Sequence, residues 1–559
     1  MLPKRKWNKL LIIFFILGLI IIYIYKSFVN IYVTQSDNKE ISNLIKTAEY
    51  MQENKVISGI TYYVSQDGTS TSGTDINNPM SFETANNKKY YGGDKVLFKR
   101  GDIFYGIFDF DVNADKDNLF YVGSYGDENL EKPRINGSAV LVNLDAWEYE
   151  NGLYKLDMSN EKNFSGIKNE LKGTYNVGSF IDENGKVHGN RKNTKELLKK
   201  NFDFYCKDAY LYLKCDSNPG KLLGKISITF QNKLVNVSSN MILDGIIIEN
   251  TGVHGIVKKQ HPISNVCIID CVIQNIGGSY SSNGRYGNGI EFWHQAKDTI
   301  VKNCIIRNVY DAGYTCQGNS VTDGFYNNVC TDNVFINCSY AFEFFCHKNY
   351  TYENIHFKGT VVEHNIVINQ GKGWGFEARD DKGQPADLVI WEIVNEKNGL
   401  TYKNNRLYNS RALYYKYPTV PLDTYKSLVD SDNNLYYNNS DTIAFISDKE
   451  YNDISNLKRY DVDDNSNFYS LTDEEIEKIS NEEILSSNDY NEIKKYYDDF
   501  DIRYRNEKIS KNIVEKLEKI KEKNQSIFLN KNVNVVYENF VNQINKLYID
   551  IDNIDQNAI

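Results

Sequence analysis

A short phrase of alternating apolar and polar positions recurs along the middle of the chain. Each copy opens on Asp, Asn or His, continues with alternating apolar residues and closes near an Asn. The copies begin at Asp244, Asp270, Asn303, Asp332, His364, Asn404 and Asn433. Copies that start a few tens of residues apart predict a stacked architecture. Alternation with a period of two predicts that the repeating unit consists of strands.

No helical pattern separates the copies, so we expect three short strands and their turns in each repeat, wound as one coil of a parallel β-helix. Each coil buries its apolar residues only by stacking on its neighbours. The polar residues that open and close the phrase would then pair with turn backbone, which satisfies polar groups close to the core.

A second phrase precedes the first within each coil and begins at a small residue: Gly255, Gly289, Gly313, Ala341, Gly375 or Ala412. The residue after it is apolar or aromatic and should point inward, so the next position should point outward. Stacking the phrases predicts two outward columns. The first is Val257, Glu291, Thr315, Glu343, Glu377 and Tyr414, and the second is Lys259, Trp293, Gln317, Phe345, Arg379 and Lys416. Lys258 faces inward in this register.

These phrases resemble the coils of the pectate-lyase-like right-handed parallel β-helix superfamily. Segments nearer the N-terminus resemble its entry coils: Tyr62-Tyr-Val-Ser-Gln-Asp-Gly, Gly93-Asp-Lys-Val-Leu-Phe-Lys-Arg-Gly-Asp, Val122-Gly-Ser-Tyr-Gly and Lys132-Pro-Arg-Ile-Asn-Gly. The resemblance covers roughly residues 60 to 445 and implies an all-β fold, a right-handed parallel β-helix. It also implies a polysaccharide as partner, acted on by a lyase, hydrolase or epimerase, but one fold hosts several reactions. The pectinase aspartates and the pectate-lyase calcium pattern are not found.

The acidic members of the first column, Glu291, Glu343 and Glu377, are the candidate catalytic residues. Strands of neighbouring coils lie about 4.8 Å apart, which predicts roughly 5 Å between Glu343 and Glu377 and roughly 10 Å between Glu291 and Glu343. Glycoside hydrolysis uses two carboxylates about 5–5.5 Å apart for retention or about 6.5–9.5 Å apart for inversion. The stack allows either geometry. Adjacent carboxylates also raise one pKa, as a general acid requires.

Basic and aromatic residues near these glutamates are the candidate substrate-binding residues: Lys259, Arg285, Trp293, His294, Arg379 and Lys416. Cations of this kind also suit a uronate lyase or epimerase. Long insertions would wall a groove over the columns; they are residues 277–287, 319–330, 348–359 and 380–400. We favour a glycoside hydrolase, and a non-catalytic cell-surface carbohydrate-binding or structural β-helix is the alternative from another class. No cofactor is required; Ca²⁺ is the candidate if one is used, near Glu377 and the two aspartates after Arg379.

The N-terminus predicts the compartment. Lys4, Arg5, Lys6 and Lys9 precede an apolar run from Leu10 to Tyr25. The positive-inside rule then predicts a cytoplasmic segment at residues 1–9, a transmembrane anchor at 10–29, a linker at 30–59, and an extracellular remainder. A cleaved signal peptide is the alternative, but no small-x-small cleavage site follows the run. The net charge of -10 argues against a nucleic-acid partner.

The rest of the chain divides into a β-helix at residues 60–445, with an irregular, partly helical insertion near 160–225, and a helical region at 446–559. Thr472 and Glu475 have the spacing of a capping box. We expect this charged tail to cover the open end of the β-helix. Nine cysteines cannot all pair within the chain. Only Cys206 and Cys215, which flank a predicted hairpin, are candidates for a bridge.

Overall fold

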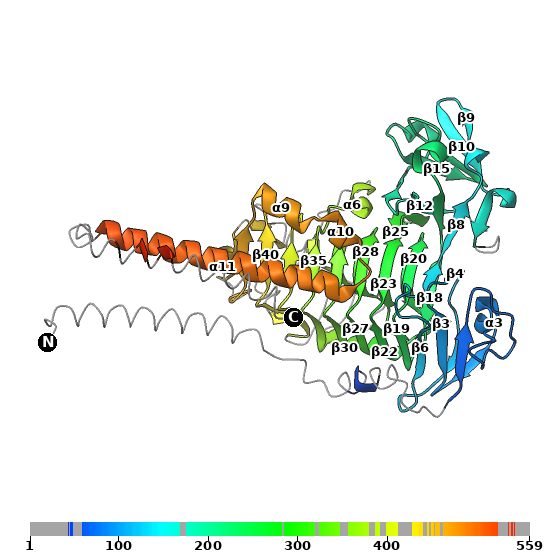
Figure 1. The fold of residues 1–559 in the computed structure, drawn as a ribbon, viewed down its shortest axis with the longest axis horizontal. Helices are drawn as coiled ribbons and strands as arrows, with labels where there is room; N and C mark the ends of the chain where they lie inside the picture. Colours follow the sequence, from blue (N-terminus) through cyan, green and yellow to red (C-terminus); the bar gives the residue numbers. More distant parts are fainter. Residues whose placement is uncertain are drawn as a thin grey trace.

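The computed structural model describes most of the chain between residues 59 and 523. The described ranges are 59–167, 175–281, 284–318, 324–346, 356–379, 386–391, 398–411, 427–439, 444–446, 449–451, 453–458 and 462–523, together with residues 43, 45–47, 535, 538, 539, 541 and 542. Three long sheets of parallel strands wind into a solenoid (Figure 1). The predicted all-β solenoid is therefore confirmed.

The predicted transmembrane segment at residues 10–29 lies outside the described residues. Within the part of the chain that the structure describes, no helix combines the length and the apolar character needed to cross a bilayer. The anchor, the cytoplasmic segment before it and the extracellular location stay predictions from the sequence.

Each complete coil contributes one strand to each of three sheets. Sheet 1 contains β18 (Lys233–Val237), β21 (His254–Lys258), β26 (Ile290–Trp293), β29 (Ala312–Gln317), β32 (Tyr340–Phe345) and β36 (Ala386–Trp391). Sheet 2 contains β1 (Thr61–Val64), β3 (Lys95–Lys99), β6 (Phe120–Tyr125), β19 (Met241–Asp244), β22 (Ile263–Ile269), β27 (Ala296–Lys302), β30 (Phe325–Thr331), β34 (Thr360–Glu363), β37 (Leu400–Lys403) and β39 (Val429–Asp432), with β33 (Phe357–Lys358) beside β30.

Sheet 3 contains β4 (Ile103–Tyr105), β7 (Arg134–Asn136), β20 (Ile247–Thr251), β23 (Val272–Ile276), β28 (Ile305–Val309), β31 (Val334–Ile336), β35 (Ile366–Ile368), β38 (Arg406–Tyr408), β40 (Leu435–Asn438) and β43 (Asn467–Ser470). β43 pairs in parallel with β40, so sheet 3 continues past residue 445, where the sequence pattern ends. Shorter elements are α3 (Phe82–Asn86), β2 (Lys89–Tyr91), β5 (Asp111–Asn113), β41 (Ala444–Ile446) and β42 (Lys449–Tyr451).

The recurrent phrase of the sequence marks the two turns that bracket the strands of sheet 3. Six of its seven opening residues have φ values from 51° to 57°: Asp270, Asn303, Asp332, His364, Asn404 and Asn433. Six of its seven closing residues have φ values from 54° to 63°: Asn250, Asn275, Asn308, Asn337, Asn369 and Asn409. Asn and Asp tolerate this left-handed conformation better than other residues with a side chain, which explains why they recur.

A ladder of buried asparagines follows the opening residues. The side-chain amides of Asn333, Asn365 and Asn405 each donate to the side-chain oxygen of the next rung, ending on Asn434, over 3.1, 3.1 and 3.2 Å. The same oxygens also accept from backbone N–H groups of the preceding rung. The ladder thus satisfies backbone groups that the turns bury.

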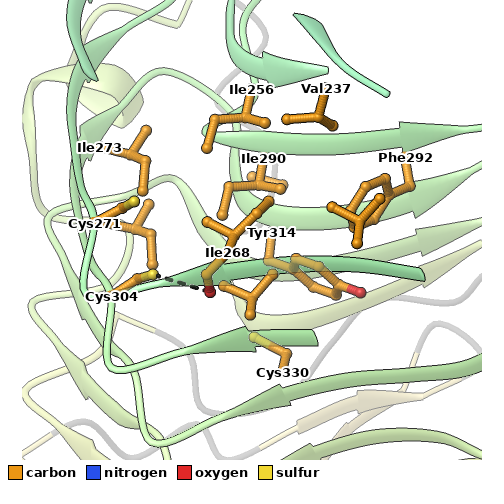
Figure 2. Close-up of a cluster of buried hydrophobic side chains, with 14 of the residues drawn as sticks. Val237, Ile256, Ile268, Cys271, Ile273, Ile290, Phe292, Cys304, Tyr314 and Cys330 are labelled. Atoms are coloured by element: carbon orange, nitrogen blue, oxygen red, sulfur yellow. Dashed lines mark hydrogen bonds between the residues drawn. The ribbon is translucent and has the colours of Figure 1, made fainter. Parts of the chain in front are cut away.

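Apolar side chains from the three sheets fill the interior. Figure 2 shows Ile256 and Ile290 of sheet 1 near Ile273 of sheet 3 and the thiols at Cys271 and Cys304, with Phe292 of sheet 1 on the far side of the isoleucines. All nine cysteines are free, so the predicted bridge between Cys206 and Cys215 is wrong. Cys206 on β15 (Asp203–Lys207) faces Leu211 on β16 (Tyr210–Leu213), whereas Cys215 lies beyond the end of β16.

The insertion is built mainly from antiparallel strands and is only slightly helical, unlike the partly helical region expected near 160–225. We call it the insert and define it as the described residues of 138–230. One sheet contains β8 (Ser138–Leu141), β11 (Phe164–Gly166), β12 (Val177–Ile181), β13 (Val187–His188) and β17 (Ile226–Phe230); the other contains β9 (Glu148–Glu150), β10 (Leu153–Asp157), β14 (Asn190–Arg191), β15 and β16. Its helices are η1 (Leu144–Ala146), η2 (Glu161–Asn163), η3 (Lys195–Leu197) and α5 (Pro219–Leu223). Its own apolar core includes Leu156, Phe180 and Phe204.

The C-terminal region contains α8 (Ile454–Lys458), α9 (Asp473–Ile479), α10 (Glu482–Ser486) and α11 (Tyr490–Lys523). The predicted capping box between Thr472 and Glu475 is present. The first turns of α11 lie along the outer face of sheet 3 and not over the open end of the solenoid as expected (Figure 1). The reason is that outward residues of this sheet are apolar, among them Ile247, Val272 and Ile305, and need a cover.

Candidate functional site

The register of sheet 1 places two of the three predicted glutamates on one column. Val257 pairs with Glu291, Glu291 with Thr315, and Thr315 with Glu343. The next partner of Glu343 is Val389 on β36, so the predicted position of Glu377 in this column is wrong. The segment Trp374–Glu377 forms the short helix α6, and the mostly apolar run Ala386–Trp391 supplies the strand instead.

Glu343 on β32 is the half-buried centre of this site. Its Oε1 accepts a hydrogen bond of 2.9 Å from Nε1 of Trp391, and its Oε2 accepts one of 2.5 Å from Nε2 of Gln317. Burial, together with the neighbouring Asp311, raises the pKa of Glu343 to about 8, against opposing effects of Arg379 and Trp391. A carboxyl group with this pKa is largely protonated at neutral pH and can act as a general acid.

Asp311, immediately before β29, is the second carboxylate of the site. Nη1 of Arg379 lies 2.7 Å from its Oδ1 and also donates to the carbonyl of Tyr310 over 3.4 Å. The Arg379 guanidinium lies 5.3 and 5.4 Å from the ring centroids of Tyr310 and Tyr340. Because the two rings and the carbonyl fix the guanidinium, they also fix its contact with Asp311.

Glu291 is a third carboxylate of the site, and a polar network holds it. Its Oε2 accepts a 2.6 Å hydrogen bond from Nδ2 of Asn288, whose Oδ1 accepts from the backbone of Ala312. The backbone N–H of Asn288 donates to Nδ1 of His254, which lies 3.4 Å from the same Glu291 oxygen. Burial lowers the pKa of His254, although Glu291 opposes the shift. His254 is therefore a neutral acceptor at neutral pH, and Asn288 is the donor that orients Glu291.

A row of mostly aromatic side chains runs beside the carboxylate column. Trp293, Gln317, Phe345 and Trp391 are successive register partners, so Trp391 takes the place that the sequence predicted for Arg379. All four are partly exposed. Parallel strands stack about 4.8 Å apart, so the row follows the long axis of the solenoid. Aromatic faces in this arrangement can stack on successive sugar rings.

Thr315 lies in register between Glu291 and Glu343. Its side chain is fully buried, and within the described part of the chain its hydroxyl has no hydrogen-bond partner. A buried hydroxyl without a hydrogen bond lowers the stability of the folded protein, so Thr315 is the least favourable position of the column.

Several predicted substrate-binding residues have other partners. Nζ of Lys259 lies 2.9 Å from Oδ1 of Asp109 and donates to the carbonyl of Phe110 over 2.9 Å, which ties two coils together. Arg285 donates to backbone carbonyls, as described below. The His294 ring contacts those of His261 and Trp293, with centroids 4.9 and 5.4 Å apart.

Glu377 is 59% exposed, and its Oε1 accepts from Nη1 of Arg411 over 3.1 Å. Lys416 lies outside the described residues. Lys258 points inward as the register predicts, and its Nζ donates to the carbonyl of Gln295 over 2.9 Å. The structure therefore places Glu291, Glu343 and Trp293 on sheet 1 and brings Arg379 to Asp311 at the start of β29. Glu377 lies in α6, outside the column.

Sequence reasoning missed two members of the site, Asp311 and Trp391. Asp311 lies in the turn before a strand, and the aligned columns include only positions within the strands. Trp391 lies in a stretch interpreted as a loop, although its short continuous apolar segment Leu388-Val-Ile-Trp carries the signal of a buried strand. His254 is buried beside Glu291 and belongs to the same network.

No group of three or more His, Cys, Asp or Glu side chains suited to a metal ion occurs among the described residues. The aspartates Asp380 and Asp381 of the predicted Ca²⁺ site lie outside those residues. Glu377, their expected companion, is paired with Arg411. The Ca²⁺ site stays a prediction.

A cavity of about 1230 Å³ lies elsewhere, between sheet 2 and the start of α11. It is lined by residues that include Lys95, Tyr121, Asp244 and Asp270. Burial raises the pKa of Asp244 to about 6, and the hydroxyl of Tyr121 donates to its carboxylate over 2.6 Å. Asp270 is one of the left-handed turn residues that open the recurrent phrase. The turns thus account for Asp270, and the sheet 1 cluster is the better candidate for catalysis.

Comparisons with known proteins return only distant structural similarity. No protein-family model matches the chain, and no curated protein matches it. Among solved structures, a GH136 lacto-N-biosidase from Eubacterium ramulus matches at 13% identity and a TM-score of 0.36, over 76% of this chain and 68% of that one. A glycoside hydrolase matches at 9% identity and 0.37, over 69% and 95%, and pectate lyase Pel9A at 11% and 0.31, over 65% and 76%. Because these TM-scores lie below 0.5, we take no mechanism from them.

Proposed function

We propose that the protein is a glycoside hydrolase that cleaves a glycan along sheet 1, with Glu343 as general acid and Asp311 as its partner carboxylate. The observation that carries this proposal is the contrast between two neighbouring carboxyl groups. Burial and Asp311 raise the pKa of Glu343 to about 8, whereas Asp311 forms an ion pair with Arg379. Two carboxyl groups in such different environments divide naturally into an acid and a base or nucleophile.

In the first step, the proton of Glu343 moves to the glycosidic oxygen as the bond from that oxygen to the anomeric carbon breaks. Asp311 then supplies electrons in one of two ways. It either bonds to the anomeric carbon, to be released later by water, or it accepts a proton from the water that attacks that carbon. Glu291 adds negative charge near the developing oxocarbenium ion, and the effect of Glu291 on the pKa of Glu343 shows that the two groups interact.

The charges of the site favour a neutral glycan over a uronate. A uronate lyase needs a cation to neutralise the substrate carboxylate. Three basic residues that were predicted to bind substrate, and that the structure describes, have partners within the protein. Lys259 pairs with Asp109, Arg379 pairs with Asp311, and Arg285 donates to backbone carbonyls. The acidic side chains of Asp311 and Glu291 also outnumber the one arginine beside them, which would repel an anionic sugar. The aromatic row suits the apolar faces of neutral sugars.

An exported, membrane-anchored location is part of the proposal and rests on the sequence alone. The basic residues before Leu10 and the apolar run up to Tyr25 support it. A glycan outside the cell is a substrate that such an anchor would keep within reach.

Incubation of the protein with neutral glycans and with uronate glycans tests the proposed reaction. New reducing ends without ultraviolet absorbance from unsaturated uronate are the expected result with a neutral glycan. Ultraviolet absorbance from unsaturated uronate would instead indicate a lyase. Binding without cleavage would indicate a carbohydrate-binding protein. The matched variants are Glu343→Gln, which should be inactive, and Glu377→Gln, which should retain activity.

A further inference from the structure

Arg285 on β25 (Gly284–Tyr286) joins three segments that are far apart in the sequence. Its Nε donates to the carbonyl of Gly278 over 2.7 Å, its Nη2 to the carbonyl of Gly178 in the insert over 3.2 Å, and its Nη1 to the carbonyl of Ala378 over 2.7 Å. All three acceptor residues are buried. The planar guanidinium can serve three fixed carbonyls at once, which a lysine cannot do in the same geometry.

The insert and the hairpin β24 (Ser279–Ser281) to β25 approach each other closely at this point. A Cβ at Gly178 would lie 2.4 Å from the carbonyl oxygen of Gly277, and a Cβ at Gly278 would lie 2.5 Å from that of Gly178. Only glycine allows the two backbones to meet in this way. The contact is therefore built into the sequence on both sides.

The third acceptor of Arg285 connects this contact to the catalytic carboxylates. Ala378 directly precedes Arg379, whose guanidinium contacts Asp311. Arg285 and Arg379 also share one aromatic ring, because their guanidinium carbons lie 4.6 and 5.3 Å from the ring centroid of Tyr310. A second link joins the insert to the same segment, since Nε1 of Trp374 in α6 donates to the carbonyl of Gly189 over 3.0 Å.

From these contacts we propose that Arg285 is a positioning residue, which holds the segment at Ala378 so that Arg379 stays on Asp311, and that the insert thereby sets the geometry of the site. The inference rests on the proposed function for its catalytic meaning. The coupling itself is a property of the protein without substrate. Loss of Arg285 leaves three buried carbonyls without this donor, so the Ala378–Arg379 segment moves away from Asp311.

The indole N–H of Trp391 reports this coupling without any turnover, because it donates to Glu343. Labelling the five tryptophans with ¹⁵N, and assigning Trp391 with a Trp391→Phe variant, gives a resonance that follows the titration of Glu343. When Arg379 leaves Asp311, its lowering effect on the pKa of Glu343 is lost. The midpoint should therefore move upward by about one pH unit in Arg285→Met, a typical effect of one nearby charge.

Arg191→Met is the matched control. Arg191 in the insert also contacts the hairpin, because its guanidinium lies 5.2 Å from the ring centroid of Tyr280, and its Nη1 donates within the insert to the carbonyl of Val177 over 2.8 Å. No contact that the structure records takes Arg191 to Ala378 or Arg379 within the described residues. The Trp391 midpoint should stay at the wild-type value in this variant.

An unchanged midpoint in Arg285→Met, a shift of equal size in Arg191→Met, or a Trp391 resonance insensitive to pH would each overturn the proposal. If Arg285→Met does not fold, Arg285→Lys keeps the charge but not the fork and should shift the midpoint in the same direction. The kinetic counterpart is a fall in kcat larger than any rise in KM. A midpoint shift in a protein that cleaves no glycan would leave the coupling intact and remove only the proposed function.

Discussion

The indole of Trp391 donates a 2.9 Å hydrogen bond to Oε1 of Glu343, although the two residues are 48 positions apart in the sequence. Trp391 stands one strand further along sheet 1 and belongs to the aromatic row. A sugar ring that stacks on this row would therefore lie beside the proposed general acid. The fixed indole also limits the rotation of the carboxyl group, which a positioned general acid requires.

Replacement of Glu343 by Gln should lower the rate of glycan cleavage by about 10²–10⁴-fold, the usual contribution of a general acid. Glu377→Gln is the control, because Glu377 is exposed and bonded to Arg411. Release of reducing ends measures both. Equal rates in Glu343→Gln and wild type would remove Glu343 from the mechanism.

The same residue should make stability depend on pH. The pKa of Glu343 is about 8 in the folded protein against 4.5 for the ordinary side chain, so the folded state holds a proton that the unfolded chain releases. Its favourable contribution is complete below about pH 4.5 and is lost as the pH rises to about 8. The melting temperature of Glu343→Gln minus that of wild type should therefore increase between these pH values and level off above them. A difference independent of pH would contradict the raised pKa.

How far the sequence predicts this molecule depends on the element. The phrase that opens on Asp270 or Asn303 predicts the coils well, because left-handed turns restrict the residue type and parallel stacking repeats that restriction in each coil. The outward column is predicted correctly from Val257 to Glu343 for the same reason. Periodic constraints of this kind are visible in a single sequence.

The site is less predictable, because its contacts depend on where irregular segments fold. Gly375-Phe-Glu matches the repeat but forms a short helix, so Arg379 reaches Asp311 from outside the column. Trp391 occupies the strand position that the alignment gave to Arg379. The position of α11 was not predictable from the sequence either. The apolar outer face of sheet 3, against which α11 packs, forms only when the coils are stacked.

The asparagine ladder should contribute measurably to stability. Asn365 donates to Oδ1 of Asn405 and to the carbonyl of Cys330, and its own Oδ1 accepts from the backbone of Asn333. Asn365→Ala leaves the buried backbone N–H of Asn333 without this acceptor, which should cost about 1–3 kcal/mol. Urea unfolding measures the loss. Asn129→Ala, at an exposed turn, should change stability by less than about 0.5 kcal/mol; a similar loss in both variants would contradict the role of the ladder.

The attachment of α11 to sheet 3 should depend on Ile493, which is fully buried. Ile493→Ala should lower stability by about 2–5 kcal/mol, the usual cost of such a truncation in a core. It should also expose the tail, so limited proteolysis should remove the C-terminal region faster. Lys495→Ala changes an exposed position on the same helix and should leave the cleavage rate as in wild type. Equal rates in both variants would show that α11 is held elsewhere.

The most direct test of Glu343 as the general acid is the titration of its carboxyl group, followed through the chemical shift of the carboxyl carbon. In protein labelled with ¹³C at the glutamate carboxyls, the signal that is missing from Glu343→Gln identifies this residue. Its chemical shift should change with a midpoint near pH 8, since burial and Asp311 favour the protonated form. A midpoint near 4.5, the value of an ordinary glutamate, would show that Glu343 is ionised at neutral pH and is not the general acid.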